Sequence, residues 1–496
     1  MTIKTLAIVL SMFVSISSFA QQKALYDLEF HTENYHTQTL SIAGKTFKVR
    51  AYEHLVYVKN PVDTAYQVMN IYVPEAYFEG ESINGYTAAN APIFFPNQIG
   101  GYMPAKPAST IADTNNRMPP MTTGGRPAAE KKESALLVAL SKGYVVASAG
   151  ARGRTQLNGR APAGLVDLKA AVRYLNFNDN KIPGNSKKII SNGTSAGGAM
   201  STLLGATGDN TDYEPYLKDL GAATGSDAIF AVSAYCPITN LDHADMAYEW
   251  QFNGINTYQN RRFGPDKANS PVTNTLTQQQ IRVSSELKLL FPAYLNSLQL
   301  KDEAGRLLTL DNEGEGNFKE LIKHYVIASA QKAVNQGADL TKISWINVEN
   351  SKVTDLDFKA YIQYLERQKT PPAFDALDVS TPENQLFGTD KIDRQHFTDF
   401  GAKNSVVPDA THASQLEVKM MNPMNYIGIP ATRTAMYWRI RHGSRDKDTG
   451  LAISVILGTY LKDNGKDVNL ELPWDKTHSG DYDLEELFTW ADSICK

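Results

Sequence analysis

Cysteine is almost absent from this sequence, because only Cys236 and Cys495 occur among 496 residues. Two cysteines are too few for a scaffold held together by disulfide bonds or for a zinc site made of thiolates. The sequence leaves open a single disulfide bond between them, because an exported protein can form one. Cys236 follows the apolar run AIFAVSAY and also fits a buried core thiol.

Long hydrophobic runs are also missing, since no segment reaches the roughly 20 apolar residues that span a bilayer. The longest run lies near the N-terminus, between Lys4 and the small residues Ser18 and Ala20. This pattern is typical of a cleaved export signal. We therefore expect a signal peptide over residues 1–20 and a mature protein in the periplasm or the medium.

Neither sign of charge dominates, because 49 basic residues stand against 53 acidic ones and neither sign forms long blocks. A nucleic-acid or membrane-surface partner is therefore not expected, and a small-molecule substrate fits better. No histidine or cysteine cluster has zinc spacing, and no calcium-loop pattern occurs. We expect chemistry without a metal or cofactor, and the sequence leaves the oligomeric state open.

Apolar runs of strand length alternate with helical periodicity, which is typical of a parallel sheet covered on both sides. Helices are expected over 130–143 and 165–175. The interval 241–430 differs, because it has helical stretches (279–298, 318–337 and 356–369) but no convincing run of buried strands. The eight expected strands are 47–58, 66–75, 91–96, 144–151, 187–193, 228–237, 435–443 and 468–474.

One serine stands among an unusual number of glycines, in the stretch KKIISNGTSAGGAMS over 187–201. A β-branched run leads into Gly193-Thr194-Ser195-Ala196-Gly197, and small residues typical of a close-packed helix follow. This is the G-x-S-x-G turn that exposes a nucleophile at the end of a strand. The pattern predicts an α/β-hydrolase fold with a mostly parallel eight-stranded sheet. In that fold residues 21–240 and 431–496 form the core, and 241–430 forms a large helical cap between the sixth and seventh strands.

A serine nucleophile needs an imidazole to take its proton and a carboxylate to orient that imidazole. Among nine histidines only His478 follows the last strand, where the base of this fold belongs. The acid is expected just after the seventh strand, where Asp446 comes first and Asp448 is its rival. His442 ends that strand and is interpreted as structural.

The oxyanion of the tetrahedral intermediate needs backbone amide donors. One is expected from Ala196, directly after the nucleophile. The others are expected from the loop after the third strand, where Gly100 and Gly101 allow a close approach of the backbone.

Several longer stretches resemble the bacterial tannases, which are related to feruloyl esterases. They are SNGTSAGGA, CPITNLDHADMAYEW, RQKTPPAFDAL with TPENQLFG, and RHGSRDKDTG with LPWDKTHSGDYDL. The resemblance covers most of the mature chain and implies a serine esterase that releases gallic acid from galloyl esters and depsides.

The resemblance also implies roles for individual residues. The family's triad falls on Ser195, Asp446 and His478, and its galloyl-binding residues fall on Lys369, Glu383 and Asp448. Two carboxylates and an ammonium can hold three adjacent phenolic hydroxyls, whereas a feruloyl ring replaces one donor by a methoxy group. Ile238 is our candidate for the apolar surface under the ring.

Two alternatives remain open from the sequence. A feruloyl or broad aryl esterase would share the fold and the triad but not the need for Lys369, Glu383 and Asp448. A binding protein on an inactive hydrolase scaffold would have no use for both Ser195 and His478. The sequence does not distinguish gallotannins, catechin gallates and simple alkyl gallates as natural substrates.

Overall fold

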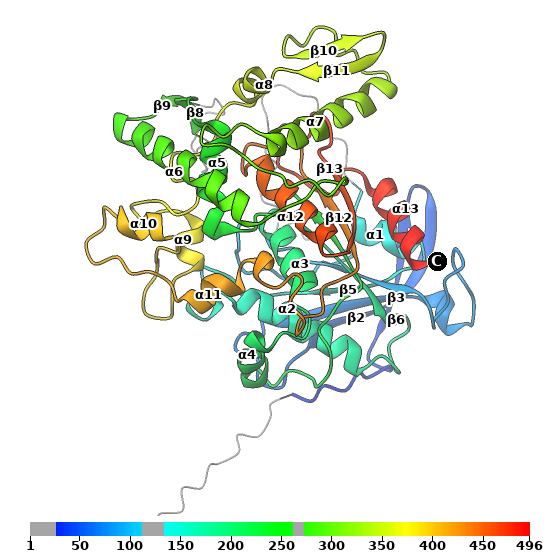
Figure 1. The fold of residues 1–496 in the computed structure, drawn as a ribbon. Coiled ribbons are helices and arrows are strands. Elements are labelled where there is room, and N and C mark those ends of the chain that lie inside the picture. Colours follow the sequence, from blue (N-terminus) through cyan, green and yellow to red (C-terminus); the bar gives the residue numbers. More distant parts are fainter. Residues whose placement is uncertain (1–25, 112–132, 261–271) are drawn as a thin grey trace, which may run out of the picture.

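The core of the protein is a twisted nine-stranded sheet (Figure 1). The structure, a computed structural model, describes residues 26–111, 133–260 and 272–496, so the expected signal peptide over 1–20 lies outside the described residues. The strand order is β1-β2-β3-β5-β4-β6-β7-β12-β13. In chain order the strands are β1 (His36–Ile42), β2 (Lys45–Val56), β3 (Val68–Pro74), β4 (Pro92–Pro96), β5 (Val145–Ala149), β6 (Asn185–Thr194), β7 (Ala231–Tyr235), β12 (Tyr437–Arg441) and β13 (Asp467–Glu471).

The prediction of eight strands is wrong by one, because β1 adds an antiparallel edge strand beside β2. Most of the β1 side chains are exposed or half-buried, so this strand lacks the apolar run that marks the other eight. Ala43 and Gly44 join β1 to β2 with positive φ values of 47° and 76°, as in a tight hairpin turn. Within the sheet, β5, β4, β6, β7, β12 and β13 pair in parallel, while the β1–β2, β2–β3 and β3–β5 pairs are antiparallel, so the sheet is mixed.

Helices cover both faces of the sheet, as predicted. On one face α1 (Ala135–Ser141) packs beside α13 (Leu484–Cys495), and Phe488 of α13 contacts Phe94 of β4 with ring centroids 5.2 Å apart. The opposite face carries α2 (Ala163–Phe177), α3 (Ala196–Ala206) and α12 (Leu451–Asp463). Three short helices, η3 (Thr211–Tyr213), α4 (Glu214–Asp219) and η4 (Pro423–Asn425), lie near α2 and α3.

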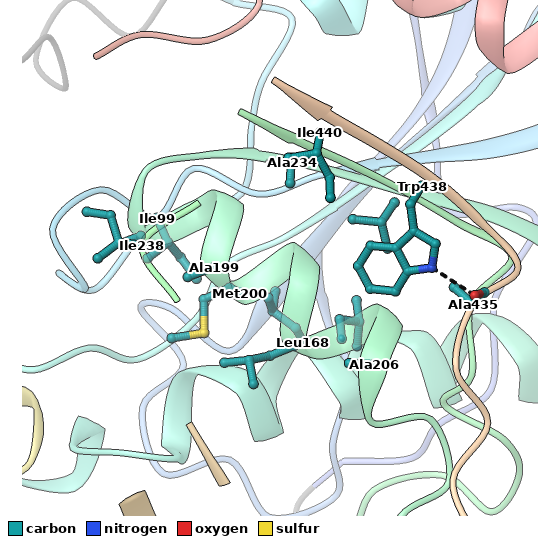
Figure 2. Close-up of a cluster of buried hydrophobic side chains, with 14 of the residues drawn as sticks. Ile99, Leu168, Ala199, Met200, Ala206, Ala234, Ile238, Ala435, Trp438 and Ile440 are labelled. Carbon is teal, nitrogen blue, oxygen red and sulfur yellow. Dashed lines mark hydrogen bonds between the residues drawn. The ribbon is translucent and has the colours of Figure 1, made fainter. Parts of the chain in front are cut away.

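The helix after Ser195, α3, contributes Ala199, Met200 and Ala206 to the buried cluster that also contains Trp438 (Figure 2). A Cβ added at Gly205 of α3 would come within 2.2 Å of the Val232 side chain and 3.1 Å of the Trp438 ring. Trp438 is fully buried and its indole N–H donates to the Ala435 carbonyl at 2.8 Å. The small residues of α3 therefore allow a close contact that fixes the helix, and with it the turn at Ser195.

The segment between β7 and β12 contains seven α-helices, the short helix η4 and two short antiparallel hairpins among its described residues. The hairpins, β8–β9 (Thr257–Asn260 and Val272–Thr275) and β10–β11 (Ile346–Glu349 and Lys352–Leu356), were not predicted, because four- or five-residue strands leave little periodicity. The helix predicted over 356–369 ends earlier, at Leu365, because Glu366 has a φ of 61°. The helices are α5 (Leu241–Phe252), α6 (Gln278–Ser297), α7 (Asn317–Asn335), α8 (Phe358–Leu365), α9 (Pro382–Leu386), α10 (Asp399–Lys403) and α11 (Gln415–Met420).

Cys236 and Cys495 are both free and buried, so the alternative of a bridge between them does not hold. Among the helices of the described ranges, we find none long and apolar enough to cross a bilayer.

Candidate active site

Ser195 stands on a strained turn between β6 and α3. Its φ of 62° and ψ of −125° lie outside the regions that a residue with a side chain prefers. Two backbone hydrogen bonds hold the turn, from Ser195 N to the Tyr235 carbonyl and from Ala199 N to the Ser195 carbonyl, both 2.9 Å long. The turn therefore presents the serine side chain at the end of the strand, as the G-x-S-x-G pattern predicts.

The glycines on each side of Ser195 are required by close backbone approaches. A Cβ at Gly193 would lie 2.2 Å from the Gly197 carbonyl oxygen, and a Cβ at Gly197 would lie 2.6 Å from the Ile99 carbonyl oxygen. No ordinary Cβ contact is that short. The glycine-rich stretch thus lets the nucleophile turn pack against the loop that follows β4.

Ser195, His478 and Asp446 form a continuous hydrogen-bonded chain, although they lie far apart in the sequence. The Ser195 Oγ lies 2.8 Å from His478 Nε2, and His478 Nδ1 lies 2.8 Å from Asp446 Oδ2. Asp446 follows β12 and is fully buried, and His478 follows β13. The structure therefore brings together the three residues that the sequence predicts, at the carboxyl ends of parallel strands.

The charges around this chain favour an ionised acid and a strongly basic imidazole. Burial raises the pKa of Asp446, but His478 and His442 outweigh it and lower that pKa to about 2. Burial lowers the pKa of His478, but Asp446, Cys236 and Asp448 outweigh it and raise that pKa well above 6.5. Such an imidazole can take a proton from the Ser195 hydroxyl.

His442 lies behind the acid and does not replace His478. It is fully buried, its Nδ1 lies 3.0 Å from Ser454 Oγ, and its Nε2 lies 3.9 Å from Asp446 Oδ2. Burial lowers the pKa of His442. These contacts fit the structural role that the sequence indicates.

The loop after β4 brings Gly100 and Gly101 to the cavity that Ser195 also lines. Ala196 is buried at the start of α3, where the first amides of a helix have no partner within the helix. The side chain of Asn97 fastens the loop to the nucleophile turn, because its Nδ2 donates to the Gly197 carbonyl at 3.0 Å. Asn97 was not predicted from the sequence, although it stands in the same PNQIGG motif as the two glycines.

Lys369, Glu383, Asp448 and Ile238 line the same cavity as Ser195 and His478. Its volume is about 2020 Å³. Lys369 Nζ lies 3.2 Å from Asp448 Oδ2. The four predicted binding residues therefore share one space with Ser195 and His478.

A single lysine faces two carboxylates that differ in basicity. Burial raises the pKa of Glu383, and Lys369 opposes that shift without cancelling it. For Asp448 the balance is reversed, because Lys369 and His478 outweigh burial and lower its pKa. Such a set offers strong acceptors and one donor to a ligand with several hydroxyls.

Two further side chains that contact Lys369 or Asp448 were not predicted from the sequence. Gln368 Nε2 donates to Asp448 Oδ1 at 3.0 Å. Lys369 Nζ also lies 3.9 Å from the centroid of the Phe374 ring, a cation–π contact. Both residues stand in the RQKTPPAF motif beside Lys369, but no local pattern shows that Asp448, about 80 positions away, lies opposite.

One group of side chains of the types that bind metal ions occurs in the part of the chain that the structure describes. Ligand atoms of Cys236, Asp446 and His478 lie within 4.8 Å of one another. Asp446 and His478 are already hydrogen-bonded in this group, and the Cys236 thiol lies 3.6 Å from the Ser479 carbonyl oxygen.

Comparison with known proteins decides the family. The crystal structure of a tannase from Fusobacterium nucleatum is 48% identical in sequence, with a TM-score of 0.87, over 95% of this chain and 100% of that one. The chain belongs to the bacterial tannases. The tannin acyl hydrolase of Lactobacillus plantarum is 43% identical, with a TM-score of 0.86, over 95% of this chain and 99% of that one.

The other comparisons agree with this assignment. A tannin acyl hydrolase structure in complex with ethyl gallate has the same identity of 43%, coverage of 95% and 99%, and TM-score of 0.86. The family model BD-FAE matches residues 123–294, while no curated protein matches the chain. The predictions of an α/β-hydrolase-like fold and of a carboxylic ester hydrolase of the tannase group are thereby confirmed.

Proposed function

We propose that this tannase hydrolyses galloyl esters and depsides of tannins and simple gallates through an acyl-enzyme on Ser195. The observation that carries the proposal is the chain from Asp446 through His478 to Ser195, which ends in the cavity lined by Lys369 and Glu383. The bound ethyl gallate of a 43% identical tannin acyl hydrolase supports the substrate class.

In the proposed reaction, the Ser195 oxygen attacks the ester carbonyl while His478 accepts the hydroxyl proton. Asp446 holds the imidazole in the required tautomer and stabilises its charged form. The oxyanion receives hydrogen bonds from the amides of Ala196, Gly100 and Gly101. His478 then donates its proton to the leaving alcohol, and a water molecule, activated by the same imidazole, releases the acid from Ser195.

The acyl group is selected at the far end of the site in this proposal. Lys369, Glu383 and Asp448 bind the three galloyl hydroxyls, and Ile238, which is 4% exposed, contacts the face of the ring. A ring without these hydroxyls displaces water from the charged groups without replacing its hydrogen bonds, which is costly. Galloyl recognition thus rests on the penalty for the wrong ring as well as on contacts with the right one.

The domain division is part of the same proposal. Residues 241–430 act as a cap on a core of residues 21–240 and 431–496, because the cap supplies Lys369 and Glu383 while the core supplies Ser195, Asp446 and His478. We further propose that residues 1–20 direct export, so that the enzyme meets its substrate in the periplasm or the medium.

Replacing Glu383 with glutamine tests the galloyl contact. The change keeps an acceptor oxygen but removes the negative charge, so a charge-assisted hydrogen bond of about 1.5 to 3 kcal/mol becomes a neutral one of about 0.5 to 1.5 kcal/mol, and we expect kcat/KM for methyl gallate to fall about 5- to 10-fold. Hydrolysis of p-nitrophenyl acetate, which has no phenolic hydroxyl on its acyl side, should stay within about threefold of wild type. Glu349→Gln, on the exposed β10–β11 hairpin, is the matched control. An equal loss on both esters for Glu383→Gln would leave a general aryl esterase as the better interpretation.

The pH dependence of the enzyme tests the role of His478. Only a neutral imidazole accepts a proton, so kcat/KM for p-nitrophenyl acetate should rise with pH through a midpoint above 6.5. Asp448 helps to raise the pKa of His478, so Asp448→Asn should move this midpoint to lower pH.

Asp475→Asn is the control for this experiment. Asp475 stands in the same loop as His478 but pairs with Arg445 at 2.7 Å, and we expect no shift of the midpoint for this variant. A midpoint that stays in place or rises in Asp448→Asn would contradict the proposed electrostatic coupling.

A further inference from the structure

One face of α5 holds the cap segment that carries Lys369. Asp245, Tyr248, Glu249 and Phe252 follow the spacing of a single helix face. All four are buried and contact the segment 367–375. This helix therefore determines where the segment lies.

Two buried carboxyl side chains of α5 fix the two ends of that segment. At one end the Arg367 guanidinium pairs with the Glu249 carboxylate, with Nη1 to Oε1 at 2.9 Å, and both side chains are fully buried. At the other end the Asp245 carboxylate accepts hydrogen bonds from the amides of Phe374 at 2.7 Å and Asp375 at 3.0 Å. Lys369 lies between these two anchors.

The hydroxyl of Tyr248 is bonded at the middle of the segment. It accepts hydrogen bonds from the amides of Gln368 at 3.2 Å and Lys369 at 3.1 Å, and it donates to the Lys447 carbonyl at 3.0 Å. A tyrosine hydroxyl has one donor and acceptor lone pairs, so this oxygen uses both functions at once. It joins the backbone of the cap segment to that of the loop after β12.

The two backbones that meet at this hydroxyl carry the Lys369–Asp448 ion pair. Lys369 is bonded to it through its own amide, and Asp448 follows directly after Lys447. The pair is 3.2 Å long and only about one fifth exposed, with side-chain exposures of 21% and 17%. A shift of either backbone would change the spacing of the ammonium and the carboxylate in the cavity.

We infer that Tyr248 is a positioning residue: its hydroxyl sets the spacing of Lys369 and Asp448 and so determines the preference for a trihydroxylated acyl ring. The inference rests on the proposed binding of galloyl hydroxyls by these two residues. Tyr248 itself does not line the cavity, so it acts through its backbone partners.

The test is Tyr248→Phe, alone and combined with Lys369→Met. The single variant loses hydrogen bonds but keeps the ring, and we expect kcat/KM for methyl gallate to fall about 5- to 30-fold, mainly through KM. Hydrolysis of p-nitrophenyl acetate should stay within about threefold of wild type. In the Lys369→Met background the same change should cost less than about twofold, because the pair that it positions is already lost.

Two features of the experiment separate positioning from general damage. Rates are expressed per active site, counted by titration with an organophosphonate, so unfolded molecules do not contribute. Tyr213→Phe is the matched control, because this buried hydroxyl donates to the Met420 carbonyl at 2.7 Å, away from the cavity. It should leave the ratio of the two esters unchanged.

The possible outcomes distinguish this inference from the proposed function. Additive losses for Tyr248→Phe and Lys369→Met, or an unchanged ester ratio in Tyr248→Phe, would overturn the positioning role. If Lys369→Met itself left methyl gallate hydrolysis intact, the proposed galloyl contact would fail first.

Discussion

Ser195→Ala is expected to abolish ester hydrolysis, with a loss of about 10⁶-fold in kcat, the scale seen when a serine hydrolase loses its nucleophile. The change removes one oxygen atom, which lies 2.8 Å from His478 Nε2. The turn itself is held by backbone hydrogen bonds that alanine keeps. The fold, followed by circular dichroism and the melting temperature, should therefore stay as in wild type.

The measurement for this variant is the initial rate on both methyl gallate and p-nitrophenyl acetate. Ser493→Ala, on the exposed side of the C-terminal helix, is a control for the removal of a serine hydroxyl. Turnover by Ser195→Ala near the wild-type rate would refute the assignment of the nucleophile.

Asp446→Asn is expected to reduce kcat by about 10⁴-fold on every ester, because the imidazole is then held in the wrong tautomer. Asp446 is fully buried, and its Oδ2 lies 2.8 Å from His478 Nδ1. An asparagine amide would donate a hydrogen bond to His478 Nδ1 and so favour the tautomer with its proton on Nε2. In that tautomer Nε2 cannot accept the proton of the Ser195 hydroxyl.

Asp448→Asn is the matched comparison, since it changes the same atoms two residues away. The Asp448 Oδ2 lies 3.9 Å from His478 Nε2 and 3.2 Å from Lys369 Nζ. We expect this variant to lose activity on methyl gallate while it retains hydrolysis of p-nitrophenyl acetate. The opposite pattern, with Asp448→Asn inactive on all esters and Asp446→Asn nearly normal, would exchange the two roles.

The meeting of Ser195, His478 and Asp446 could be predicted from the sequence because the topology brings them together. Parallel strands end at one edge of a sheet, so residues after β6, β12 and β13 meet there whatever lies between them in the chain. Ser195 carries a local signature, since its turn forbids a Cβ at Gly193 and Gly197. Its position, and those of Asp446 and His478 after their strands, needed no knowledge of the cap.

The binding end of the site could not be derived in this way. Lys369 stands beyond a helix that ends at Leu365, and Glu383 stands on a five-residue helix. Neither has a periodic pattern around it, so only the resemblance to tannases indicated them. The contact between Lys369 and Asp448 depends on α5, because side chains of this helix bind backbone amides of the segment 367–375. These contacts join residues that lie far apart in the chain, so no local sequence pattern predicts them.

The most direct test of the central claim compares two esters on the unmodified enzyme, methyl gallate and methyl benzoate. Both present the same ring and the same methyl ester to Ser195, but the second has no phenolic hydroxyl for Lys369, Glu383 or Asp448. A site built to bind hydroxyls rejects an analogue without them by about 10⁴-fold, and we predict a ratio of kcat/KM of that size in favour of methyl gallate. Comparable values for the two esters would contradict the account.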